Sequence, residues 1–163
     1  MASPVRSAPI LIGYDGARAA EHALREAAGL LAVRDVLVVV VWKAGLSFEL
    51  IELPASSIGL PPARLDIRTA MEVDRAIYEG AQREAQRAAA LARSLGLDAE
   101  GLVVAEAPEV PVAETLLTLA REREAQAIVV GAHSHAGLGS TSRTVVRGAR
   151  CPVLVVHEPP PEG

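Results

Sequence analysis

One run of apolar residues restricts the possible folds of this chain more than any other feature of its sequence. Residues 36–42 are all apolar and mostly valine, and Asp35 and Lys43 bound them on either side. Valine favours strands, and a strand without polar alternation must be covered on both faces. The run is also far shorter than the roughly 20 residues that cross a bilayer. It therefore predicts a central strand of a buried parallel sheet rather than a membrane span.

Short apolar segments alternate with helical patterns along the rest of the chain. Further strands are predicted at residues 10–12, 102–104, 127–131 and 153–156. Helices are predicted at residues 18–32, 69–94, 112–124 and 140–149. Strands that alternate with helices indicate a parallel sheet with right-handed crossovers. Aromatic residues are 2% of a chain that is 50% hydrophobic, so aliphatic side chains must build the core. We predict an α/β fold: an open five-stranded parallel sheet with helices on both faces.

Two segments interrupt this alternation. Residues 43–68 contain prolines, serines and a glycine that preclude a long regular element. We interpret them as a variable surface connection, and the alternative is a flap over a ligand. Residues 158–163 are rich in proline and are expected to form a disordered tail, which leaves residues 1–157 as a single domain.

Charge and cysteine content narrow the environment and the partners. The net charge is −4 and aromatic residues are scarce, which argues against a nucleic-acid partner. Cys151 is the single cysteine, so an intramolecular disulfide framework is excluded. The N-terminal residues show no signal-peptide pattern. We expect a cytoplasmic protein with no membrane association.

The residues that could bind a ligand follow the first and the fourth predicted strands. In open α/β sheets, ligands bind beyond the carboxyl ends of the strands, where the strand order reverses. Residues 13–16 follow the first strand, and residues 131–142 follow the fourth. The second segment has three glycines and then hydroxyl residues at the start of a helix, a pattern that suits phosphate. The alternative is that Ser140 only caps the helix while the arginines that follow it are solvated.

Asp15 and the histidines are the remaining candidates for chemistry. The Asp15 carboxylate could accept hydrogen bonds from a ribose or an adenine amino group, or it could form an Asx turn with Gly16. His133 and His135 flank Ser134, but nothing nearby completes a metal-ligand set or a catalytic set. We therefore predict no catalytic residue, no metal site and no enzyme activity, with a weak ATPase left open.

Several motifs resemble those of the universal stress protein family. An apolar strand leads into Gly13-Tyr14-Asp15-Gly16, and a later strand ends in Ile-Val-Val-Gly at residues 128–131. Gly139-Ser140, a short helix and Cys-Pro-Val-Leu-Val-Val at residues 151–156 complete the resemblance, which covers residues 9–157. It implies a Rossmann-like sheet with strand order 3-2-1-4-5. It also implies a homodimer through the last strand, whose residues are Val153, Leu154, Val155 and Val156.

The resemblance further implies a site for ATP with Mg²⁺. The family positions fall on Asp15, Val41, Gly131, Ser134, Gly139 and Ser140. With their neighbours, the assigned binding residues are Gly13, Tyr14, Asp15, Val41, Val130, Gly131, Ser134, Gly139, Ser140 and Thr141.

Three departures from the family pattern leave two functions open. Ser134 replaces the second glycine of the phosphate loop, the loop is about five residues shorter, and Ala17 replaces the usual hydroxyl residue. The first hypothesis is a dimeric stress-response module that binds ATP or a related adenine nucleotide. The alternative has the same fold and dimer, binds no nucleotide, and recognises an unknown protein partner.

Overall fold

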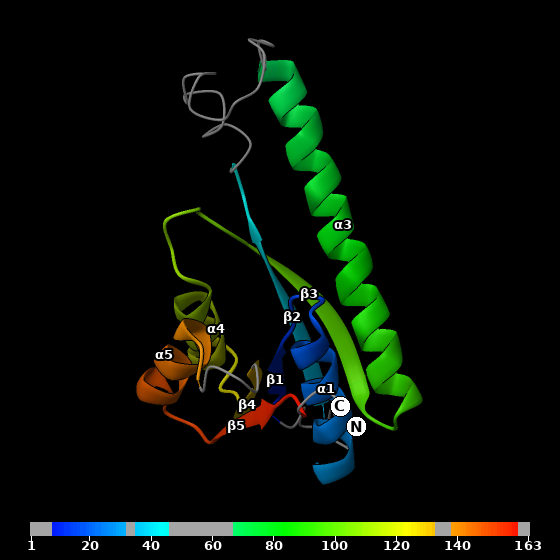
Figure 1. Ribbon diagram of the computed structural model, residues 1–163, viewed down its shortest axis with the longest axis vertical. Helices are drawn as coiled ribbons and strands as arrows, with labels where there is room; N and C mark the ends of the chain where they lie inside the picture. The colour runs from blue at the N-terminus through cyan, green and yellow to red at the C-terminus, as the bar shows by residue number, and fades with distance from the viewer. Residues whose placement is uncertain (1–7, 32–34, 46–66, 133–137, 160–163) are drawn as a thin grey trace, which may run out of the picture.

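The computed structural model describes residues 8–31, 35–45, 67–132 and 138–159 as a three-layer α/β domain (Figure 1). The strands are β1 (Ile10–Gly13), β2 (Asp35–Lys43), β3 (Asp98–Glu106), β4 (Ala127–Ala132) and β5 (Val153–His157). The helices are α1 (Arg18–Leu30), α3 (Ile67–Ser94), α4 (Val112–Glu122) and α5 (Ser140–Gly148). All strand pairs are parallel, in the order β3-β2-β1-β4-β5, as predicted. No helix in this part of the chain is both long enough and apolar enough to cross a membrane.

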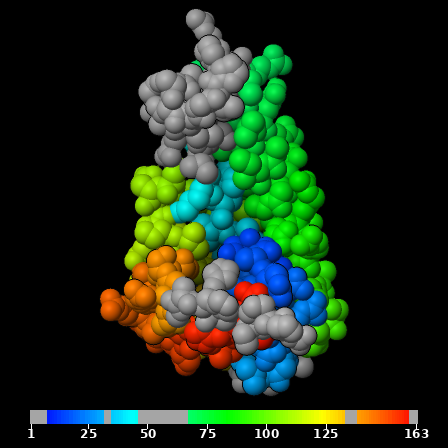
Figure 2. All heavy atoms as spheres, in the orientation of Figure 1, coloured from blue at the N-terminus to red at the C-terminus, as the bar shows by residue number. Residues whose placement is uncertain are grey.

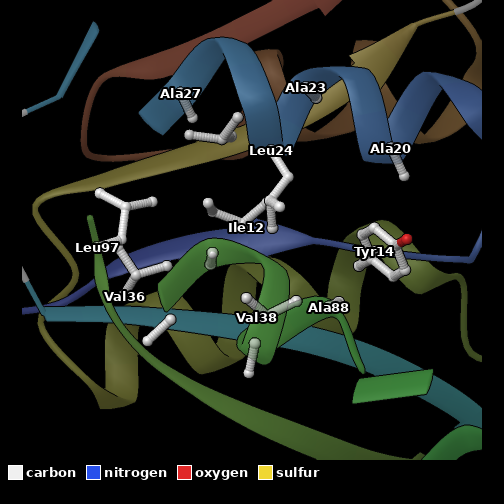
Figure 3. Close-up of a cluster of buried hydrophobic side chains, with 14 of the residues drawn as sticks. Ile12, Tyr14, Ala20, Ala23, Leu24, Ala27, Val36, Val38, Ala88 and Leu97 are labelled. Carbon is white, nitrogen blue, oxygen red and sulfur yellow. The ribbon is translucent and has the colours of Figure 1, made fainter. Parts of the chain in front are cut away.

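Alternate residues of the central strands enter two separate hydrophobic cores. Ile12 and Val38 point toward α1 and α3, where they meet Leu24 and Ala88 (Figure 3). Leu11 points to the opposite face, toward α4 and α5. This two-sided burial is the reason why the apolar run of β2 shows no polar alternation.

Helices α1 and α3 approach the sheet through small residues. A Cβ atom added to Gly131 on β4 would lie 2.5 Å from the carbonyl oxygen of Ala19 in α1. A Cβ atom added to Gly101 on β3 would lie 2.5 Å from the carbonyl oxygen of Ala85 in α3. Both strands therefore need glycine at these positions for the helices to pack this closely.

All five strands and helix α3 are longer in the structure than predicted, and β3 is extended most. The third strand was expected at residues 102–104, but β3 begins at Asp98 and ends at Glu106. β3 pairs only with β2 and lies at the edge of the sheet, so it accommodates polar residues that a central strand would not. Helix α3 begins two residues earlier than expected, and within it Tyr78 packs on Trp42 with ring centroids 4.8 Å apart.

Candidate functional site

A cavity of about 450 Å³ lies beyond the carboxyl ends of β1, β2 and β4. The turn that follows β1 contributes Tyr14 and Asp15, and the start of α5 contributes Ser140 and Thr141. The β1–α1 turn and the segment after β4 therefore meet at one edge of the sheet, as the strand order requires.

Strand β2 is longer than β1, and this difference opens one wall of the cavity. The pairing of β1 with β2 ends at Gly13 and Val39, where the amide of Tyr14 donates to the carbonyl oxygen of Val39 at 2.8 Å. Backbone groups alternate in direction along a strand, so the amide and carbonyl of Val41 face the same side as those of Val39. Beyond Gly13, β1 no longer occupies that side. Val41 therefore presents one backbone donor and one backbone acceptor to the cavity.

Asp15 forms the Asx turn that was one of its two interpretations. Its Oδ1 accepts a hydrogen bond from the amide of Ala17 at 2.9 Å, and Gly16 takes a positive φ of 79°. The residue is exposed and lines the cavity. A hydrogen bond to Oδ1 leaves Oδ2 able to accept a hydrogen bond from a ligand, so the turn and a binding role are compatible.

Tyr14 is fixed between the cavity and the core beneath α1 and α3. Its exposed fraction is 6%, and it packs with the cluster drawn in Figure 3. Burial, followed by the nearby carboxylates of Glu84 and Glu21, raises the pKa of the Tyr14 phenol, and Arg87 opposes this shift. The phenol is therefore neutral at physiological pH, and it ties the β1–α1 turn to α3.

The N-terminus of α5 opens into the cavity without a side-chain cap. The N-cap residue is Gly139, so the alternative in which Ser140 only caps this helix is wrong. Ser142 is buried, and its hydroxyl donates to the carbonyl oxygen of Gly139 at 3.2 Å. The first turn carries no acidic residue. Its backbone amides therefore have no carboxylate competitor within the turn, an arrangement that favours an anion.

The two glycines at the ends of the β4–α5 segment have different roles. Gly131 is needed for the close approach of α1, so packing explains it without any ligand. Among the described residues, the atom nearest to a Cβ atom at Gly139 would be the Ser142 hydroxyl oxygen at 4.0 Å, an ordinary van der Waals contact. The close approach of a ligand to the backbone could therefore explain the glycine at position 139, whereas helix packing already explains the glycine at position 131.

The cavity brings together nearly all the residues that the sequence singled out. It is lined by Gly13, Tyr14, Asp15, Val41, Val130, Gly131, Gly139, Ser140 and Thr141. Ser134 lies outside the described residues, as do His133 and His135. Ser142, one of the hydroxyl residues expected at the start of the helix, also lines it. The sequence interpretation did not assign the other lining residues, which are Ala19, Ala20, Val39, Val40, Val112, Leu116 and Ala132. Those on α1 and α4 line the cavity because these helices pack at this edge, which no local motif encodes.

In the described part of the chain, histidine, cysteine, aspartate and glutamate residues form no group of three or more that could hold a metal ion.

Comparison with known proteins assigns the fold to a family. The model of the universal stress protein family matches residues 7–157. This chain belongs to the universal stress protein family. A search of curated proteins finds no significant match.

Solved structures agree with this assignment. A universal stress protein from Archaeoglobus fulgidus is 25% identical with a TM-score of 0.58, over 92% of this chain and 93% of that one. A universal stress protein from the same organism in complex with dAMP is 21% identical with a TM-score of 0.55, over 93% and 99%. A family protein from Arabidopsis thaliana with AMP bound is 12% identical with a TM-score of 0.60, over 94% and 93%. At these lower identities the two complexes support the fold alone.

Proposed function

We propose that this universal stress protein binds an adenine nucleotide as a signal and acts as a dimeric stress-response module. The observation that carries the proposal is the composition of one cavity. A free backbone edge at Val41, the carboxylate of Asp15 and the N-terminus of α5 all open into it. These groups could bind the base, the ribose and the phosphates of a nucleotide, in that order.

The edge at Val41 supports adenine as the base. The Val41 amide can donate to the adenine N1 atom, and the Val41 carbonyl can accept from the adenine amino group. Guanine has an acceptor where adenine has its amino group and a donor where adenine has N1, so both bonds would be mismatched. Half-buried Val112 and buried Leu116 would cover the base from α4.

The remaining groups support a ribose and phosphates. The Asp15 carboxylate would accept hydrogen bonds from the ribose hydroxyls, with the turn amide of Ala17 holding its orientation. The α5 amides and the Ser140 and Thr141 hydroxyls would hold the phosphates. Mg²⁺ would accompany ATP, held mainly by the phosphate oxygens. Asp15 is the only carboxylate in the described lining and serves the ribose here, so we propose binding without rapid hydrolysis.

Calorimetric titration with ATP·Mg, AMP and GTP tests the proposal. We expect both adenine nucleotides to bind, and GTP to bind at least about tenfold more weakly because two hydrogen bonds are mismatched. Asp15→Asn should lower the affinity for the adenine nucleotides by about tenfold, since one charge-assisted hydrogen bond is lost. Asp98→Asn, an exposed carboxylate at the opposite end of the sheet, is the matched control and should change nothing. The absence of binding at millimolar nucleotide would reject the proposal and favour the nucleotide-free interaction module.

The dimer is proposed through the open edge of β5. Pro152 directs its carbonyl toward β4, because the amide of Ile128 donates to it at 3.0 Å. By alternation, the backbone groups of Val153 and Val155 face away from β4, where a second copy could pair with them. Val153, Leu154 and Val155 are only half-buried in the single chain.

Val155→Pro would remove one outward amide and leave the β4 hydrogen bonds in place. Sedimentation analysis should give a dimer for the original protein and a monomer for Val155→Pro. Val155→Ala is the control and should remain dimeric. A monomeric original protein would reject this part of the proposal.

A further inference from the structure

The cavity has anion-binding amides and hydroxyls, but its described lining contains no lysine or arginine. The charge of a nucleotide grows with each phosphate, and a short loop offers few amides to neutralise it. A cation that meets the outer phosphates must therefore lie at the rim of the cavity.

Arg18 directly adjoins the described lining of the cavity, and we call residues in this position the rim. It is the first residue of α1, and it directly precedes Ala19, which lines the cavity and contacts the Gly131 position. Its side chain is 89% exposed. A cation at a helix N-terminus is disfavoured by the helix dipole, so this position offers α1 no electrostatic advantage.

Glu158 forms an ion pair with Arg18 and adjoins the lining residue Ala132. The Nε atom of Arg18 lies 3.5 Å from the Oε1 atom of Glu158. The amide of Glu158 donates to the carbonyl oxygen of Ala132, another lining residue, at 2.9 Å. In Figure 2 the first residues of the domain (blue) lie beside the end of β5 (red) on the face that also shows α5 (orange). The ion pair thus joins the start of α1 to the ends of β4 and β5. Glu158 was expected to begin a disordered tail, and it lies one residue beyond the family match.

We infer that Arg18 is a specificity-determining residue that makes the affinity depend on the number of phosphates. When the nucleotide binds, Arg18 leaves its ion pair with Glu158 and binds the outer phosphate instead. This inference rests on the proposed nucleotide function. Exposed ion pairs contribute little stability, whereas an arginine binds phosphate through two parallel, charge-assisted hydrogen bonds. The exchange therefore favours a ligand long enough to reach the rim. The Glu158 carboxylate opposes the phosphates by repulsion and by competition for Arg18.

Titrations with adenosine, AMP and ATP·Mg test the inference. Arg18→Ala should lower the affinity for ATP by about tenfold and the affinity for AMP by less than about threefold. It should leave the affinity for adenosine unchanged, because only the outer phosphates reach the rim. Glu158→Gln should raise the affinity for ATP by about threefold, because it frees Arg18 and removes a negative charge. The loss caused by Arg18→Ala should be larger in the Glu158→Gln background, where no competitor holds the arginine.

Arg75→Ala is the matched control. It removes an arginine from an exposed ion pair with Glu79 on α3, away from the cavity lining, and should leave all three affinities unchanged. Equal losses for adenosine and ATP in Arg18→Ala would indicate a structural role and overturn the inference. Tight ATP binding that neither Arg18→Ala nor Glu158→Gln changes would overturn it while the proposed function stands. A failure of the original protein to bind any adenine compound would overturn both.

Discussion

Helices α1 and α5 both begin at the cavity, but they are anchored to the sheet very differently. α1 buries Ala19, Ala20, Ala23, Leu24 and Ala27 along its length, and its backbone approaches β4 at Gly131. α5 buries only Ser142 and Val145. The turn that carries Asp15 is therefore fixed by a closely packed helix, whereas the phosphate end of the site depends on a lightly anchored one.

This difference indicates that the two halves of the site are preformed to different degrees. The nucleoside half is built on β1, β2 and α1, whose groups are held in place before a ligand arrives. The anion half is a helix N-terminus whose position a ligand can stabilise, because binding to the folded state adds to its stability. Segments with few buried contacts are also the first to open.

The largest expected effect is the loss of stability when the buried anchor of each helix is truncated. Leu24→Ala should lower the free energy of unfolding by about 3 kcal/mol, since Leu24 is fully buried. Val145→Ala should lower it by about 1.5 kcal/mol, because this substitution removes fewer buried atoms from the core than Leu24→Ala does. Urea unfolding of both variants measures the difference. Equal losses would show that α5 is anchored as firmly as α1.

The two glycines give the next largest effect. Gly131→Ala should destabilise the protein by about 2 kcal/mol, because its Cβ would force α1 away from β4. Gly139→Ala should destabilise the protein by less than about 1 kcal/mol, since its Cβ would make only an ordinary contact at a φ of −63° and only the N-cap preference for glycine is lost. The same urea titrations compare them. A mild Gly131→Ala variant would mean that α1 tolerates a shift, and the contrast with α5 would weaken.

Hydrogen exchange tests the comparison without any substitution. In the free protein, the amides of α5 that lie within the helix should exchange at least about tenfold faster than those of α1, because few buried contacts hold α5 closed. A saturating adenine nucleotide should slow α5 more than α1. Equal protection in the free protein, or slowing that is confined to α1, would contradict the assignment of the anion half to α5.

The sequence predicted the fold well where burial leaves a local signal. The apolar run of β2 and the alternation of strands with helices were sufficient for the parallel sheet and for the meeting of the two ligand segments, whereas the strand order was implied by the family resemblance. Strand β3 was predicted too short because its polar residues, such as Asp98 and Glu100, are acceptable only at an edge. Edge position depends on the whole topology, not on local sequence.

The site was predicted in part for the same physical reason. Residues that follow a strand end or open a helix at the carboxyl edge, such as Asp15 and Thr141, are found from local motifs. Val112 and Leu116 line the cavity only because the crossover places α4 beside it, and Glu158 comes beside Arg18 only through the pairing of β5 with β4. Gly131 lines the cavity as predicted, but helix packing also requires a glycine there, so its presence does not by itself indicate a ligand.

The smallest expected effect concerns Tyr14, which joins the β1–α1 turn to the α1 and α3 side of the core. Burial raises the pKa of its phenol above the usual value of about 10, so the folded protein retains this proton at a pH where the unfolded chain has released it. The stability contributed by the neutral phenol is therefore complete below about pH 10 and declines as the pH rises further. Urea unfolding between about pH 8 and 11 should show this decline, and Tyr14→Phe should make it shallower because the group that ionises is gone. If both proteins lose stability in parallel, the turn is not held by a buried phenol, and the rigidity assigned to the nucleoside half would rest on α1 alone.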